Sequence, residues 1–185
     1  MTSGRPRIAI YFASHDGQTR KIVDCLAGHL GVRDVGVTLI DLMAGASPAI
    51  DPEADVILVV AAIRYGYHLS AARRFLAQLQ TEVPAERIAV LSVNLTARKP
   101  GRQTAEGNIY LRKWLMRAGL RPALSAAVAG KLDYPAYRWF DRMMIQAIMH
   151  ISGGPTDAAT VIEYTDWAQV EALAGQLAAL AMTSP

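Results

Sequence analysis

Apolar and polar positions follow one another along the chain in a repeating order of buried strand and amphipathic helix. Apolar runs predict strands at 7–13, 55–63, 87–94 and 122–130, and alternating apolar and polar residues predict another at 35–42. Apolar residues at helical spacing predict helices at 18–30, 69–79, 106–118 and 166–181. Thr165 is the expected N-cap of the last helix. This alternation predicts an α/β fold, with a parallel sheet covered by helices on both faces.

Residues 131–165 depart from this order, because they are too long for a simple connection. A helix is predicted at 137–151, and Ser152-Gly-Gly-Pro155 ends it. One predicted side is apolar and carries Phe140, Met143, Met144, Ala147, Ile148 and Ile151. The other side carries Arg138, Asp141, Arg142, Gln146 and His150, with Ile145 and Met149 intruding. We therefore expect one domain over residues 1–185, with an inserted loop and amphipathic helix at 131–155.

Composition narrows the class of protein. No apolar stretch approaches the roughly 18 to 20 residues that a membrane-spanning helix needs, and residues 1–7 lack the pattern of a secretory signal. Cys25 is the only cysteine, which excludes an internal disulfide and favours a reducing, cytoplasmic setting. The four histidines show no metal-ligand spacing, so we expect no metal.

The net charge of +3 is unevenly distributed. Residues 98–142 carry ten Lys or Arg against three Asp or Glu. A one-sided basic surface favours an anionic partner such as a carboxylate, a phosphate or a lipid head group, although a solvated face without a partner has the same pattern. We expect no nucleic-acid partner, because no recognition motif accompanies the charge.

The first candidate site follows the first strand, where Ser14, His15, Asp16, Gly17, Gln18 and Thr19 lead directly into a helix. A tight turn at Gly17 lets backbone N–H groups point toward an anion, and the helix start adds partial positive charge. Hydroxyls of Ser14 and Thr19 can donate further hydrogen bonds. The sequence thus predicts a phosphate cradle, and a simple N-cap turn is the alternative. The usual ATP and dinucleotide motifs are absent.

Two further loops should lie at the same end of the sheet. After the third strand come Ile63, Arg64, Tyr65 and Gly66, with Tyr67 and His68 beyond them. Tyr65 or Tyr67 offers a stacking face for a planar ring, and Gly66 permits close backbone approach. After the fourth strand come Ser92, Val93, Asn94 and Leu95, whose polar groups can form hydrogen bonds with the edge of a planar ring. Three such loops predict a flavin site more specifically than any one of them.

The order of these loops resembles the flavodoxin fold, and several longer motifs resemble one branch of it, the menaquinone-dependent protoporphyrinogen IX dehydrogenases. The motifs are Ser14-x-Asp-Gly-Gln-Thr19, Ile63-Arg-Tyr-Gly66, Ser92-Val-Asn-Leu95, Ala97-Arg-Lys-Pro100, Tyr134-Pro-x-Tyr-Arg-Trp139, Asp141-Arg142, Ser152-Gly-Gly154 and Tyr164-Thr-Asp-Trp167. The resemblance implies a three-layer sandwich with strand order 2-1-3-4-5 and FMN held by the three loops. It further implies oxidation of protoporphyrinogen IX on the inner face of the cell membrane, with electrons passing to respiratory quinone.

The same resemblance suggests candidates on the substrate side. Arg64, Arg98 and Lys99 are candidates for holding substrate propionates, and His68 is a candidate proton relay. The helix at 137–151 is expected to contact the membrane interface or to face the porphyrin and the quinone, unless its apolar side packs on the domain.

Two features depart from flavodoxins that act as electron carriers. Asp16 stands where a hydroxyl residue is usual, and we expect its carboxylate to cap the following helix. The chain is also basic, with a pI near 9.2, whereas those carriers are acidic. A flavodoxin-type carrier, a general FMN-dependent quinone reductase and a flavodoxin-like protein without FMN remain the alternatives.

Overall fold

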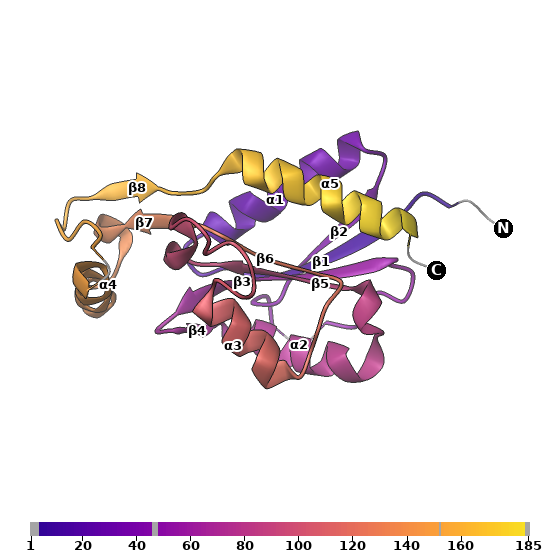
Figure 1. Ribbon diagram of the computed structural model, residues 1–185, viewed down its shortest axis with the longest axis horizontal. Coiled ribbons are helices and arrows are strands. Elements are labelled where there is room, and N and C mark those ends of the chain that lie inside the picture. The colour runs from indigo at the N-terminus through magenta and orange to yellow at the C-terminus, as the bar shows by residue number, and fades with distance from the viewer. Residues whose placement is uncertain (1–3, 46–47, 152, 184–185) are drawn as a thin grey trace.

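The computed structural model describes residues 4–45, 48–151 and 153–183 (Figure 1); the Ser152 of the predicted helix end lies outside them. Its central sheet contains five parallel strands in the order β2-β1-β3-β5-β6. Because the short strand β4 was not counted in the prediction, this is the predicted order 2-1-3-4-5. The strands are β1 (Arg7–Ala13), β2 (Gly36–Asp41), β3 (Val56–Arg64), β5 (Ile88–Val93) and β6 (Leu124–Val128). A short strand, β4 (Tyr67–His68), pairs antiparallel with the end of β3.

Helices cover both faces of the sheet (Figure 1). One face packs against α1 (Gln18–Val32) and α5 (Trp167–Thr183), and the other against α2 (Ser70–Glu82) and α3 (Ile109–Ala118). Side chains of a strand point alternately to the two faces, so an apolar run such as β1 supplies both cores. Ile8, Ile10 and Phe12 enter the core under α1 and α5, while Tyr11 enters the core under α2 and α3.

The helix ends follow capping rules, with one correction. Asn108 caps α3 by accepting hydrogen bonds from the backbone of Tyr110 and Leu111. At α5 the predicted cap Thr165 is wrong, because the Asp166 carboxylate accepts from the Ala168 and Gln169 backbone N–H groups. The hydroxyl of Thr165 instead donates to the Ala129 carbonyl oxygen at 2.8 Å. Thr165 therefore ties the start of α5 to the end of β6.

The segment between β6 and α5 forms a small unit beyond the carboxyl edge of the sheet (Figure 1). It comprises β7 (Lys131–Asp133), the 3₁₀ turn η3 (Tyr134–Ala136), α4 (Trp139–Ile151) and β8 (Val161–Glu163). The antiparallel pair β7–β8 was not predicted, because three-residue strands are too short to give a periodic signal. Two further 3₁₀ turns, η1 (Ala85–Arg87) and η2 (Leu95–Arg98), flank β5.

The orientation of α4 does not fit the alternative in which its apolar side packs on the domain. Trp139, Phe140, Met143 and Ile151 are exposed, with Trp139 at 71% and Ile151 at 86%. The helix is instead anchored by Met149 and Ile145, the two residues that intrude on its polar side. They pack with Leu132, Tyr134, Leu95, Tyr137 and Tyr164 in a third, smaller core. Most of the predicted apolar side thus faces outward.

Within the described ranges, no helix is both long enough and apolar enough to cross a bilayer.

Candidate functional site

The corner between β1 and α1 has the geometry of an anion cradle. Gly17 stands at the N-cap of α1 with a φ of 84°, a left-handed conformation that favours glycine. No side chain caps the helix, and its first turn contains no acidic residue. The N–H groups of the first turn have no partner within the helix, so they are available to a bound anion.

Side chains around this corner have three different roles. The Ser14 hydroxyl is buried and has no hydrogen-bond partner among the described residues, which is costly unless a ligand supplies one. The buried Gln18 side chain donates to the Thr165 hydroxyl at 2.9 Å, so it connects α1 to the start of α5. The expected capping by Asp16 is wrong: its carboxylate accepts from His15 Nδ1 at 2.8 Å and leaves the helix start open.

The second loop is a tight hairpin rather than an open loop. Ile63 pairs with His68 and Arg64 with Tyr67, so only Tyr65 and Gly66 form the turn. Both have positive φ, 52° and 80°, as a type I′ turn requires. A tyrosine in this conformation is uncommon. The turn holds the Tyr65 ring half-exposed at the tip, where a planar ligand could stack on it.

The third loop is supported by a buried polar network. Asn94 donates to the Ser92 hydroxyl at 2.8 Å and accepts from the Ala97 backbone N–H, which shapes η2. Asn94 and Asn108 also exchange side-chain hydrogen bonds. His68 Nε2 lies 2.7 Å from the Ser92 hydroxyl. Ser92 is therefore satisfied beneath the loop, whereas Val93, Asn94 and Leu95 reach the site above it.

A cavity of about 210 Å³ connects these loops. Of the predicted residues, His15, Asp16, Gln18, Ile63, Arg64, Tyr65, Gly66, Val93, Asn94 and Leu95 line it. The inserted segment, whose helix was expected to face the porphyrin and the quinone or the membrane, contributes one wall of this cavity. The residues of that wall were not among the predicted site residues: Lys131, Asp133, Ala136, Tyr137, Asp141, Met144, Ile145 and Ile148. Neither were Ala62, Thr96, Tyr110 and Gly130, which also line the cavity. The only sequence signal for that wall was the amphipathic pattern of the insert.

An ion-pair cluster connects the hairpin to α4. Arg64 Nη2 donates to the Asp141 carboxylate at 2.8 Å, and the Tyr65 hydroxyl donates to the same carboxylate. Arg64 Nη1 also donates to His15 Nε2. The hydrogen bond from Tyr65 and the charge of Arg64 lower the pKa of Asp141 below its usual value. We call Arg64, Tyr65 and Asp141 the latch, because they join the hairpin after β3 to α4, which is distant in sequence.

The remaining candidates lie beside this cavity rather than in its wall. His68 is buried and stacked on Trp114 with ring centroids 4.0 Å apart. Burial, and then the nearby charge of Arg73, lower the pKa of His68 to about 3, so it is neutral at physiological pH. Arg98 donates to the Leu95 carbonyl oxygen and lies over the Tyr164 ring. Lys99 follows η2 and is exposed.

The cradle lies where the strand order reverses between β1 and β3, which is the place where open α/β sheets bind ligands. A positive helix start, an unpartnered serine hydroxyl and a glycine in the left-handed region fit a phosphate monoester. The neighbouring cavity, with a tyrosine at its hairpin tip, fits a planar ring. The fold and the site together define a flavodoxin-like protein.

Comparison with known proteins agrees with this class and narrows it. The family model described as "Flavodoxin domain" matches residues 9–159. The protoporphyrinogen IX dehydrogenase [quinone] of Escherichia coli strain K12 is 40% identical over 171 residues, covering 92% of this chain and 94% of the relative. The enzyme of that name from Leishmania major is 38% identical, covering all of this chain and 80% of the relative. The chain belongs to the flavodoxin-domain family, within the group of protoporphyrinogen IX dehydrogenases [quinone].

Solved structures support the fold. A flavodoxin from the domain Archaea aligns over 95% of this chain and 99% of its own length, with a TM-score of 0.54 and 14% identity. The rubredoxin oxygen:oxidoreductase of Desulfovibrio gigas aligns over 97% of this chain and 37% of its own length, with a TM-score of 0.58 and 15% identity.

Proposed function

We propose that this chain is an FMN-dependent oxidoreductase that oxidises protoporphyrinogen IX and passes the electrons to a quinone. The observation that carries the proposal is 40% identity over nearly the full length of a protoporphyrinogen IX dehydrogenase [quinone], combined with an anion cradle that fits the FMN phosphate. Bound FMN would supply the redox chemistry, the transfer of electrons from the porphyrinogen to the quinone. The protein supplies orientation and electrostatics.

We assign the phosphate to the first-turn amides of α1 and the Ser14 hydroxyl, with Gly17 shaping the turn. The ring system would lie in the cavity between the Tyr65–Gly66 hairpin and residues 93–96. Gln18, Ser92 and Asn94 act mainly as supports, because their side chains are engaged with other parts of the protein. His15 and Asp16 lie at the rim.

The residues suggested to bind the substrate or to relay its proton remain predictions, and their observed contacts favour some of them over others. Arg64 is paired with Asp141, so its first role would be to hold α4, and any propionate would compete with that carboxylate. Arg98 is the last residue of η2 and Lys99 follows it; both remain candidates for a propionate contact. For His68, hydrogen bonding to Ser92, stacking on Trp114 and a pKa of about 3 favour a packing role over proton relay.

The decisive activity test is anaerobic mixing of FMN-loaded protein with protoporphyrinogen IX and a menaquinone analogue. Porphyrin fluorescence should appear at a rate proportional to protein concentration, and only when FMN and quinone are both present. A protein that oxidises NAD(P)H directly and ignores the porphyrinogen would be a general quinone reductase. A protein with a stable flavin radical and no porphyrinogen turnover would be an electron carrier.

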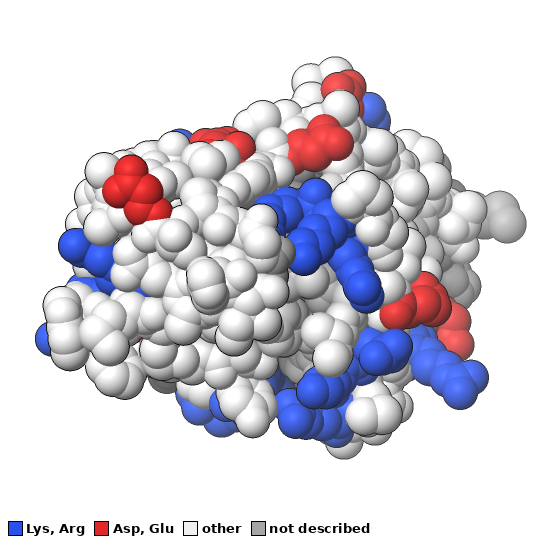
Figure 2. All heavy atoms as spheres, turned by 60° about the vertical axis from the view of Figure 1, so that its left-hand side comes forward, with Lys and Arg blue, Asp and Glu red and all other residues white. Residues whose placement is uncertain are grey.

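We further propose that the protein is cytoplasmic, that its acceptor is menaquinone and that it contacts the inner face of the cell membrane through residues 137–151. A respiratory quinone is dissolved in the bilayer, so an enzyme that reduces it benefits from lying on that surface. The exposed apolar side of α4 suits such a contact. In Figure 2, which turns the end that carries α4 toward the viewer, this end of the molecule is largely uncharged, with Asp or Glu along its upper side and Lys and Arg beside and below it. Arg138 is exposed there, whereas Arg142 turns inward and donates to the Tyr134 carbonyl oxygen.

Vesicle co-sedimentation tests the membrane contact. Phe140→Ser, Met143→Ser and Ile151→Ser together should reduce binding to phosphatidylglycerol-containing vesicles at least tenfold. The matched control replaces three exposed apolar residues elsewhere, Val32→Ser, Met116→Ser and Met182→Ser, and should bind like the parent. Equal loss in both triple variants would contradict a contact specific to α4.

A further inference from the structure

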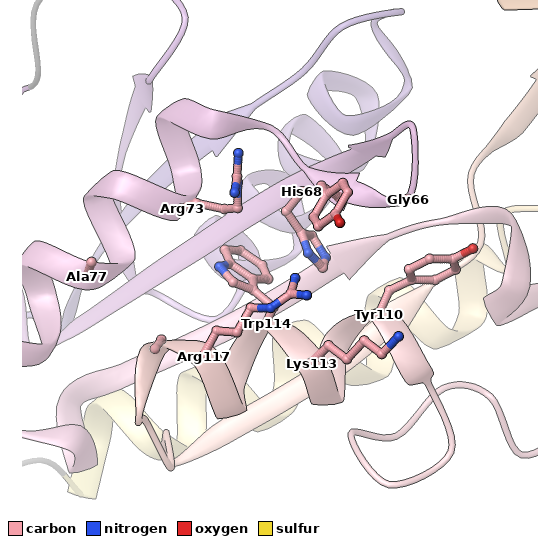
Figure 3. Close-up of a pocket in the computed structure, with 10 residues that line it drawn as sticks. Gly66, His68, Arg73, Ala77, Tyr110, Lys113, Trp114 and Arg117 are labelled. Carbon is pink, nitrogen blue, oxygen red and sulfur yellow. The ribbon is translucent and has the colours of Figure 1, made fainter.

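A second cavity, of about 170 Å³, lies between α2 and α3 on the face of the sheet that they cover (Figure 3). It is separate from the flavin cavity, but Gly66 and Tyr110 line both. Its lining contains three cationic side chains and no acidic one: Arg73, Lys113 and Arg117. We call these three residues the basic triad.

The triad brings like charges together from two helices. Figure 3 shows Arg73 projecting from α2, and Lys113 and Arg117 projecting from α3. The guanidinium groups of Arg73 and Arg117 lie over the same ring, that of Tyr67, at 5.7 Å and 5.3 Å from its centroid. Lys113 and Arg117 are four residues apart on one helix, a like-charge spacing that destabilises an isolated helix.

Nothing within the described parts of the chain neutralises this charge. None of the three residues forms an ion pair there, and α3 contains no acidic residue. Arg64, in contrast, is already neutralised by Asp141. A concave site with three cations that form no ion pair is complementary to an anion with more than one charge, and each guanidinium can bind a carboxylate through two parallel hydrogen bonds.

We propose that the basic triad binds the carboxylate side chains of the porphyrinogen and so determines substrate specificity. The proposal rests on the proposed function. Its geometric basis is the lining shared by the two cavities: a ligand that lies over the flavin site and extends past Gly66 and Tyr110 reaches the triad. The triad is a binding element remote from the reacting carbons, so it should affect substrate affinity far more than the rate of the bound complex.

Direct binding of the product tests this without turnover. The ligands are protoporphyrin IX, which keeps both carboxylates, and its dimethyl ester, which has none; each is titrated into FMN-loaded protein in the same detergent. R73Q/K113Q/R117Q should raise the Kd of the diacid at least tenfold and leave that of the ester within twofold. The control R74Q/R112Q/R121Q removes the same charge from exposed neighbouring positions and should bind both ligands like the parent.

The triad variant must also stay folded, which its circular dichroism and its affinity for FMN report. R73K/R117K keeps the charge but loses the guanidinium geometry, so its affinity for the diacid should be intermediate. In steady-state assays, R73Q/K113Q/R117Q should raise KM for the porphyrinogen at least tenfold with kcat within twofold.

Three outcomes would overturn the proposal: diacid binding like the parent in a folded triad variant, equal loss of diacid and ester, or equal loss in the control variant. If the triad variant binds the diacid normally but no longer binds phosphatidylglycerol vesicles, the site recognises lipid head groups instead. Failure of the parent protein to oxidise protoporphyrinogen IX would contradict the proposed function itself. Normal turnover with an unchanged KM in the triad variant would contradict only the subsite.

Discussion

The first loop and the inserted helix meet at the same cavity, but different forces hold them there. The corner at Gly17 is made by backbone conformation: a left-handed residue at the end of a buried strand and a helix start without a side-chain cap. The α4 wall depends on side chains, namely the latch and the small core around Met149. The difference implies that cofactor affinity should be sensitive to backbone changes at the corner, whereas the position of α4 should respond to charge and pH.

The largest effect should come from Gly17→Val. A β-branched residue is strained at a φ of 84°, so the turn should leave this conformation and misplace the backbone amides that hold the phosphate. Several hydrogen bonds to a charged group are then lost, each contributing about 1.5–3 kcal/mol. The Kd for FMN, measured by flavin fluorescence, should rise about thirtyfold or more. Gly28→Ala, an exposed position in α1 with nothing within 4 Å of the added Cβ, is the control. An unchanged Kd in Gly17→Val would show that the corner does not shape the site.

The next largest effect should be the contribution of His68 to the pH dependence of stability. Its folded-state pKa of about 3 lies below the unfolded value, so the unfolded state binds the extra proton as pH falls from about 6.5 toward 3. This residue alone should reduce the free energy of unfolding by about 2 kcal/mol between pH 8 and pH 5. Urea unfolding of His68→Gln should show a correspondingly flatter pH dependence. His150→Gln, at an exposed position on α4, should keep the parent's slope.

Ser14→Ala tests the contribution of a single hydrogen bond to the cofactor affinity of the corner. The buried hydroxyl has no partner among the described residues, and a hydrogen bond to a charged group contributes about 1.5–3 kcal/mol. The Kd for FMN should therefore rise about tenfold or more, while the apoprotein unfolds at the same or higher urea concentration. A lower midpoint for the apoprotein would indicate that the hydroxyl has a structural partner instead.

The smallest effect should come from the latch. Arg64 and Asp141 are 31% and 13% exposed, so solvent screening limits their coupling to about 1 kcal/mol or less. A double-mutant cycle with Arg64→Ala and Asp141→Ala measures it. Because the Asp141 pKa is lowered in the folded state, the contribution of the ion pair to stability is present above the normal carboxyl pKa and lost as pH falls through the lowered one.

Hydrogen exchange in α4 should increase in either single variant. Unchanged exchange would show that the Met149 core alone holds the helix.

The same contrast explains what the sequence could predict. The parallel strands, the faces of α1, α2 and α5, and the turn at Gly17 depend on local periodicity and on residue types at one corner, whereas the strand order was implied by the resemblance to the flavodoxin fold. The Tyr65–Gly66 hairpin was visible only as a possible loop, although a two-residue turn containing glycine is a hairpin signal. Thr165 and Asp166 are both good N-caps, and the Ala129 carbonyl oxygen, distant in sequence, decides between them.

The features that were not predicted depend on contacts between residues that are distant in sequence. The anchoring of α4 by Met149 and Ile145 was not predicted, because these two residues lie outside the apolar stripe and only tertiary contacts bring them to the small core that they fill. The basic triad was hidden for a related reason. Arg73 and Lys113 lie on different helices, and only the packing of α2 beside α3 brings them to one pocket.

The most direct test of the account compares FMN with riboflavin, which has the same ring system without the phosphate. In equilibrium titrations of the apoprotein, FMN should bind at least a hundredfold more tightly than riboflavin, since the cradle supplies several hydrogen bonds and a helix start to the phosphate alone. In Gly17→Val this ratio should shrink toward one. Equal affinity of the two flavins in the parent protein would contradict the assignment of the β1–α1 corner as the phosphate site, and with it the redox function built upon that site.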